Sequence, residues 1–172
     1  MCGIVGYIGK EQAAPILLEG LARLEYRGYD SAGICVAENG VLDVAKCKGR
    51  LKNLAAMTEN GALLHGTAGI GHTRWATHGE PNDINSHPHV SQNGKVALVH
   101  NGIIENYLEI REFLEEKGVQ FTSQTDSEVV AQLLEYCLGL DEVHCMQDAI
   151  YMVLHRIEGA YAFGIVCADD PE

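Results

Sequence analysis

A cysteine directly follows the initiator methionine, in the opening sequence MCGIVG. Once Met1 is removed, Cys2 carries both a thiol and a free α-amine. A thiolate is a strong nucleophile and an adjacent amine can act as its base, so this residue needs no histidine partner. The same cysteine would also suit the start of a buried strand, because free cysteine packs as a small hydrophobic residue. Other polar residues of the chain must decide between the two interpretations.

Arg74 belongs to a second group of polar residues, in the segment HTRWATHG at 72–79. An arginine at the end of a strand can hold a carboxylate through two parallel hydrogen bonds. Thr77 and His78 would add hydrogen-bond donors beside it. The alternative is a surface arginine next to a structural tryptophan, Trp75. The segment indicates a carboxylate-binding site only if residues elsewhere in the chain complete it.

Two further positions could bind the polar parts of a substrate. The Asn101 side-chain amide and the Gly102 backbone N–H would form an oxyanion hole if they converge; otherwise they are an ordinary Asn-Gly turn. Asp126, in the first turn of an expected helix, could bind a substrate ammonium group, although the helix dipole alone favours an acidic residue there. Together with Cys2 and Arg74, these residues predict hydrolysis of the side-chain amide of free glutamine or asparagine.

Histidines are concentrated between residues 72 and 100, and they could form a metal site as an alternative to the amide-hydrolysing site. His87 and His89 would be at its centre. An H-x-H pair with a proline between its members is a poor two-ligand unit, however, and no carboxylate or cysteine has matching spacing. We therefore expect neither a metal nor another cofactor. The histidines of this stretch are His72, His78, His87, His89 and His100.

The composition limits the class of protein. The 172 residues fit one domain, and a hydrophobic fraction of 47% can build a sizeable core. A net charge of −12 without a cluster of basic residues argues against nucleic acid and anionic membranes as partners. No signal peptide is recognisable, and no apolar run reaches the roughly 18 residues of a transmembrane helix. The six cysteines form no C-x-x-C pair and indicate free thiols of a reducing compartment, so we expect a cytoplasmic protein.

The elements that would position these residues follow from the pattern of apolar residues. An Asn39-Gly40 pair between two strand-like runs predicts a β-hairpin, and Thr125 with Glu128 predicts a capping box at the start of a helix. Residues 75–94 show no periodicity and are expected to form a long functional loop. Because strands and helices do not alternate strictly, the chain is predicted to be α+β with mainly antiparallel sheets. The expected strands are 2–9, 32–37, 41–47, 68–74, 95–100 and 159–168, and the expected helices are 11–25, 51–57, 104–117, 125–138 and 144–156.

Five segments together resemble a known family. They are CGIVG at 2–6, RLEYRGYDSAG at 23–33, HTRWATHGEPNDINSHPH at 72–89, VHNGIIENY at 99–107 and TDSE at 125–128. The first is shared by the class II glutamine amidotransferases. The second and third are much more specific to the sugar-amidating branch. The chain therefore resembles the N-terminal glutaminase domain of the glutamine–fructose-6-phosphate aminotransferase (isomerising) family, also called the glucosamine-6-phosphate synthase family.

The resemblance implies a fold and a set of roles. The fold would be that of the N-terminal nucleophile hydrolases, a four-layer αββα sandwich. Cys2 would be the nucleophile after removal of Met1, with its own α-amine as general base. Asn101 and Gly102 would form the oxyanion hole. Arg74, helped by Thr77 and His78, would bind the glutamine α-carboxylate, and Asp126 would bind the α-amino group. Trp75 and its loop would close over glutamine, and Arg27 would support the nucleophile.

The resemblance also implies a reaction and partners. The chain would hydrolyse L-glutamine to glutamate and ammonia through a Cys2 thioester, and the ammonia would serve glucosamine 6-phosphate synthesis from fructose 6-phosphate. Residues 1–172 would be a glutaminase domain that is incomplete at its C-terminal end. A sugar-phosphate isomerase domain, absent from this chain, would be its partner in a homodimeric full-length enzyme. The alternatives are a glutaminase domain of the amidophosphoribosyltransferase, asparagine synthetase or glutamate synthase type, and a non-catalytic metal-binding module.

Overall fold

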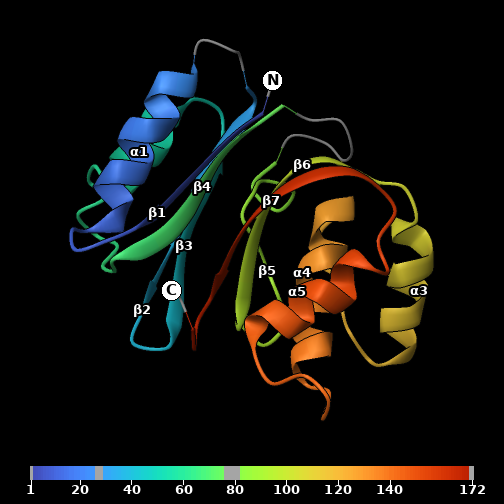
Figure 1. Cartoon of the computed structure of the whole chain (residues 1–172). Coiled ribbons are helices and arrows are strands. Elements are labelled where there is room, and N and C mark those ends of the chain that lie inside the picture. The colour runs from blue at the N-terminus through green and yellow to red at the C-terminus, as the bar shows by residue number, and fades with distance from the viewer. Residues whose placement is uncertain (1, 26–28, 76–81, 171–172) are drawn as a thin grey trace.

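The computed structural model describes residues 2–25, 29–75 and 82–170 (Figure 1). Within these ranges the strands form two antiparallel sheets, one in the order β1-β4-β2-β3 and one in the order β5-β6-β7. The strands are β1 (Gly3–Ile8), β2 (Ser31–Glu38), β3 (Val41–Lys48), β4 (Ala68–Arg74), β5 (His89–Val90), β6 (Val96–Ile104) and β7 (Gly159–Cys167). The helices are α1 (Ala13–Leu24), α2 (Leu51–Met57), α3 (Tyr107–Glu116), α4 (Asp126–Leu138) and α5 (Met146–Leu154).

Three apolar clusters hold four layers of secondary structure together. Helices α1 and α2 pack on the outer face of the four-stranded sheet, and α3, α4 and α5 pack on the outer face of the three-stranded sheet (Figure 1). Between the two sheets, Ile70 and Val99 belong to a third cluster. Leu21 and Ile34 represent the first outer cluster, and Leu133 represents the second. The expected α+β sandwich with layers in the order αββα is therefore confirmed.

The hairpin between β2 and β3 forms as predicted. Asn39 and Gly40 have φ angles of 51° and 78°, the left-handed conformation that a two-residue type I′ turn requires. Glu38 pairs with Val41 directly across the turn. The turn therefore sets the register of β3, the edge strand of the four-stranded sheet.

Strand β6 is longer than the sequence predicts. It continues past residue 100 to Ile104, and its residues Asn101 and Gly102 pair with Ala162 and Tyr161 of β7. The alternative of an ordinary Asn-Gly turn is therefore wrong. The backbone pairing with β7 holds both residues in the sheet, and this partner lies about 60 residues away in the sequence.

The loop expected at 75–94 contains one element that its sequence does not indicate. His89 and Val90 form β5, which pairs with Leu98 and Ala97 of β6. A strand of two residues is too short to show alternation, so only the pairing itself reveals it. Residues 76–81 of this loop lie outside the described ranges. The described remainder leads from residue 82 into β5.

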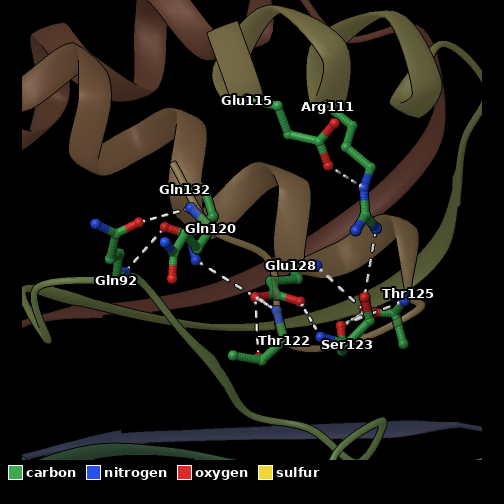
Figure 2. Close-up of polar contacts among 9 residues, drawn as sticks. All are labelled: Gln92, Arg111, Glu115, Gln120, Thr122, Ser123, Thr125, Glu128 and Gln132. Atoms are coloured by element: carbon green, nitrogen blue, oxygen red, sulfur yellow. Dashed lines mark hydrogen bonds and ion pairs between the residues drawn. The ribbon is translucent and has the colours of Figure 1, made fainter. Parts of the chain in front are cut away.

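Helix α4 begins at a cap that also organises the preceding turn (Figure 2). Thr125 Oγ1 accepts a hydrogen bond from Glu128 N at 3.3 Å, as the capping box predicts. The Glu128 carboxylate, however, accepts from Thr122 N at 2.9 Å and from Ser123 N at 2.6 Å, while Thr125 N donates to Ser123 Oγ at 3.3 Å. The expected return of Glu128 to Thr125 is therefore wrong, because the carboxylate closes the turn before the helix. This turn fixes the position of Asp126, the first residue of α4.

All six cysteines lie in the described part of the chain and have free thiols, as expected from their spacing. Cys35, Cys137 and Cys167 are buried, Cys145 is exposed, and Cys2 is half-buried just before β1. In the same part of the chain, no helix combines the length and the apolar character that a bilayer span requires.

Candidate active site

Cys2 lies against the end of β4. It directly precedes β1, whose first residue Gly3 pairs with Thr73 of the antiparallel β4. The start of β1 is thereby next to the end of β4 (Figure 1). The Trp75 backbone N–H donates to Cys2 Sγ at 3.1 Å. The sulfur therefore has a fixed hydrogen-bond donor, one residue beyond the predicted carboxylate-binding arginine.

Arg74 is a buried cation in the same region. Along β4, side chains of alternate residues share a face, so Arg74 and His72 point to the same side as Ile70, toward the second sheet. Burial lowers the pKa of the Arg74 guanidinium, and carboxylates at Asp30 and Asp126, together with Cys2 in its thiolate form, oppose this shift. An arginine keeps its charge under these conditions. Arg74 can therefore attract an anionic group of a substrate and stabilise a nearby thiolate.

Asn101 and Gly102 approach this region from β6. The Asn101 side chain contacts His72 across the space between the sheets, with 2.8 Å between Asn101 Oδ1 and His72 Nε2. Gly102 has a φ of 132°, and a Cβ at this position would lie 2.0 Å from the carbonyl oxygen of Ala160. Only glycine fits there. The backbone at Gly102 is thus held in a conformation that a side chain would prevent.

Asp126 is the first residue of α4 and is buried, with 5% of its surface exposed. Its Oδ2 accepts a hydrogen bond from Ile104 N at 2.9 Å, and its Oδ1 lies 3.5 Å from Ser127 Oγ. The carboxylate therefore ties the helix to the end of β6. Its negative charge also acts on Arg74, so the residues predicted to bind the two charged groups of an amino acid lie within electrostatic range of each other.

Four of the five histidines that the sequence singled out form a buried group between the layers. The His72 and His87 rings stack with 4.3 Å between centroids, and His89 meets His87 edge-on at 4.7 Å. Burial lowers the pKa of His72 to about 4 and that of His87 and His89 well below the usual range. Within residues 2–25, 29–75 and 82–170, no group of metal-ligand side chains is arranged to hold a metal ion.

One ring nitrogen each of His87, His89 and His100 contacts a group of the protein. His87 Nδ1 accepts from His100 N at 3.1 Å, His100 Nδ1 lies 2.9 Å from Ser127 Oγ, and His89 Nε2 lies 3.0 Å from Thr125 Oγ1. These contacts connect the site to the cap of α4. The sequence reasoning missed this role of the histidines. The available signal was the alternation of His72 and Arg74 in a strand that is otherwise apolar or small.

Lys46 is a further residue that the sequence reasoning missed. It comes from β3, and its Nζ donates to the carbonyl oxygens of Ile84 at 3.3 Å, Ser86 at 2.8 Å and Pro88 at 3.1 Å. Burial lowers the pKa of Lys46 to about 8, although the charges of Glu128 and Asp83 oppose the shift. A single side chain thus ties down the segment that carries His87.

Of the remaining predicted site residues, Trp75 lies in the described part of the chain. Trp75 follows β4 directly, and 55% of its surface is exposed. Arg27, Thr77 and His78 lie outside the described residues. Among the described residues, Cys2 contacts the residue after Arg74, and Asn101 contacts His72 of the same strand as Arg74.

The chain is similar to known glutamine amidotransferases. A family model described as a glutamine amidotransferase domain matches residues 72–172. The glutamine–fructose-6-phosphate aminotransferase [isomerizing] of Caldanaerobacter subterraneus subsp. tengcongensis is 60% identical over the whole chain, and that of Clostridium tetani is 53% identical. The chain spans 28% of the length of each of these relatives.

Solved structures give a matching result for the fold. A glutamine phosphoribosylpyrophosphate amidotransferase from B. subtilis, complexed with ADP and GMP, superposes with a TM-score of 0.81 at 31% identity; the match covers 98% of this chain and 35% of that one. A structure described as the allosteric regulatory enzyme of purine biosynthesis has a TM-score of 0.77 at 33% identity, with 96% and 35% covered. The shared part has the N-terminal nucleophile amidotransferase fold that the resemblance implied.

Proposed function

The chain belongs to the glutamine amidotransferase family, and on that premise we propose that it hydrolyses L-glutamine to glutamate and ammonia with Cys2 as the nucleophile. The observation that carries the proposal is the position of Cys2 Sγ, 3.1 Å from the Trp75 backbone N–H and within the electrostatic influence of Arg74. A nucleophile beside a buried cation suits a substrate that carries its own carboxylate.

Glutamine would be oriented by its charged ends. Its α-carboxylate pairs with Arg74, assisted by Thr77 and His78, and its α-ammonium group pairs with Asp126. The opposite charges of the two side chains and their mutual electrostatic range support this arrangement. The side-chain amide then extends toward Cys2. Trp75 and the residues that follow it cover the bound substrate, and Arg27 supports the nucleophile.

The first chemical step forms a thioester. The α-amine of Cys2, free once Met1 has been removed, accepts the thiol proton, and the sulfur attacks the amide carbon of glutamine. The oxygen of the tetrahedral intermediate receives hydrogen bonds from the Asn101 side-chain amide and the Gly102 backbone N–H. Transfer of the proton to the leaving nitrogen releases ammonia and leaves a γ-glutamyl thioester on Cys2. Water then attacks the thioester, with the same amine as base, and releases glutamate and the thiol.

We further propose that the ammonia serves the amination of fructose 6-phosphate to glucosamine 6-phosphate, a step of amino-sugar synthesis. Identities of 60% and 53% to glutamine–fructose-6-phosphate aminotransferases favour this acceptor over the phosphoribosyl type, whose solved relative is 31% identical. The relatives are much longer than this chain, so the sugar-phosphate isomerase reaction belongs to a partner domain outside it. A homodimer of the full-length enzyme and a cytoplasmic location complete the proposal.

The test is glutamate release from glutamine by the 172-residue chain. Cys2→Ala should abolish release, whereas Cys145→Ala should leave it unchanged, because Cys145 is an exposed cysteine just before α5. Mass spectrometry should find a covalent adduct on Cys2 only. Protein that retains Met1 should be inactive, because its Cys2 nitrogen is an amide. Full activity with Met1 in place would refute the proposed base.

A further inference from the structure

We propose that His72 is a positioning residue that orients the Asn101 side-chain amide for the oxyanion hole. The inference rests on the proposed glutamine hydrolysis, in which Asn101 donates to the tetrahedral intermediate. His72 would touch neither the substrate nor the thiol. Its effect on the reaction would pass entirely through Asn101.

The two side chains meet between the sheets. His72 is on the inner face of β4, two residues before Arg74, and Asn101 is on the inner face of β6, two residues after Val99. His72 Nε2 and Asn101 Oδ1 are 2.8 Å apart, a normal hydrogen-bond distance. The contact joins the strand that carries the predicted carboxylate-binding residue to the strand that carries the predicted oxyanion hole.

The protonation of His72 determines what this contact does. Burial lowers the pKa of His72 to about 4, so at neutral pH the ring is neutral and has a single N–H. The Asn101 atom in contact is the amide oxygen, which can only accept, so the proton must be on Nε2. With its oxygen held by His72, the Asn101 amide directs its N–H groups away from that ring. A reversed amide would instead turn its oxygen toward the oxyanion, where the like charges repel.

His72 is itself held in place by neighbouring rings. It is 1% exposed and stacks on His87 with an interplanar angle of 23°. His87 in turn accepts the backbone N–H of His100 through Nδ1. Burial also lowers the pKa of His87, so the stacked rings are both neutral and do not repel each other. A fixed ring gives Asn101 a fixed partner, which is what a preorganised donor requires.

The first experiment compares two substitutions in glutamate release. His72→Phe keeps an aromatic ring but removes the donor, and we expect kcat to fall about 10²-fold because the amide loses its orientation. KM for glutamine should stay within about twofold, because the residues that bind glutamine are intact. His72→Gln is the matched control: its amide nitrogen can reach the position of Nε2, so kcat should return to within about threefold of the original chain. A merely structural role would not produce this pattern.

A double-mutant cycle separates positioning from general damage. Asn101→Ala alone should lower kcat by about 10²–10³, the usual cost of one oxyanion donor. If His72 acts through Asn101, adding His72→Phe to Asn101→Ala should produce no further loss. A full additional loss in the Asn101→Ala background overturns the proposal. So does unchanged kcat in a folded His72→Phe variant.

A replacement variant and a measurement of the tautomer complete the test. Where circular dichroism shows that His72→Phe is unfolded, His72→Asn replaces it, because its amide ends near the Nδ1 position and cannot reach Asn101. Nitrogen-15 NMR of the His72 ring should find the Nε2–H tautomer at neutral pH, and the Nδ1–H tautomer would refute the inference even in an inactive chain. An unsubstituted chain that releases no glutamate contradicts the proposed function alone, whereas release that survives His72→Phe contradicts only the inference.

Discussion

Asp126 has one structural hydrogen bond and one proposed substrate contact, and a single substitution can separate them. Its Oδ2 accepts from Ile104 N at 2.9 Å, and the residue is buried at the start of α4. An asparagine could still accept from Ile104 through its carbonyl oxygen. It would, however, lack the negative charge that pairs with the ammonium group of glutamine.

Asp126→Asn should therefore raise KM for glutamine about 10- to 100-fold, the usual range for losing a hydrogen bond to a charged group. The kcat should change much less, because Cys2 and the oxyanion donors are untouched. Steady-state glutamate release over a range of glutamine concentrations measures both constants.

Asp148→Asn provides the control for Asp126→Asn, since Asp148 is also in the first turn of a helix, α5, and its carboxylate accepts from the backbone of His144, which has no proposed role in the site. It should leave KM unchanged. A kcat that falls while KM stays constant in Asp126→Asn would assign the carboxylate to the chemical step and contradict its proposed role in binding.

The types of the site residues could be predicted from the sequence, but their contacts could not. Cys2, Arg74 and Asp126 were recognised because each has a residue type suited to one part of the reaction. The contact of His72 with Asn101 was missed because it joins two strands of different sheets. Local sequence carries no information on which residues face each other across such a layer.

Strand β3 contributes to the site through Lys46, which anchors a loop instead of touching the proposed substrate. Its ammonium group donates to three carbonyl oxygens of residues 84–88. Folding lowers the pKa of Lys46 from 10.5 to about 8, mainly through burial. Between these pH values the unfolded chain binds more protons than the folded chain, so this residue makes the free energy of unfolding rise with pH.

Lys46→Met should remove that rise. The free energy of unfolding of the original chain minus that of the variant should increase by about 3 kcal/mol between about pH 7.5 and pH 10.5. Urea denaturation at several pH values measures this difference. Taking the difference between the two chains cancels the titration of other groups.

Lys95→Met is the matched control for Lys46→Met. Lys95 is exposed, and its hydrogen bond with Asp169 raises its pKa, so its contribution to stability is lost as pH rises. The corresponding difference should therefore not increase. A flat difference for Lys46→Met would mean that the buried ammonium group carries no pKa shift.

Element boundaries could be predicted where local chemistry fixes them. The Asn39-Gly40 hairpin formed because its two residues accept positive φ, which is a property of those residues alone. The predicted end of β6 was wrong because the length of this strand depends on its pairing with β7. The Glu128 side chain was also misassigned, since the conformation of the turn before α4 decided which N–H groups it meets.

At the scale of the whole molecule, the packing of the layers buries His72, His87, His89 and His100. The α+β class was predictable from the lack of strict alternation, but the insertion of β4 between β1 and β2 was not, because strand order depends on contacts distant in sequence. The burial of these histidines could not be predicted from the sequence for the same reason. Their burial links the stability of the sandwich to pH.

Acidification should therefore destabilise the folded chain. Burial lowers the pKa of His72 from 6.5 to about 4 and lowers those of the other three histidines as well. Below about pH 6.5 the unfolded chain binds protons that the folded chain excludes, so the free energy of unfolding falls as pH falls. His72 alone should account for about 3 kcal/mol by about pH 4.

Urea denaturation between about pH 7 and pH 4 tests this, since each excess proton bound on unfolding adds about 1.4 kcal/mol per pH unit to the slope. His89→Gln should reduce the slope by about one proton, because its amide can still contact Thr125 Oγ1 but does not titrate. The same substitution at His65, which is exposed, is the control for replacing a histidine outside the buried group. Equal slopes for His89→Gln and the original chain would show that His89 is protonated in the folded sandwich, contrary to the neutral ring that its burial requires.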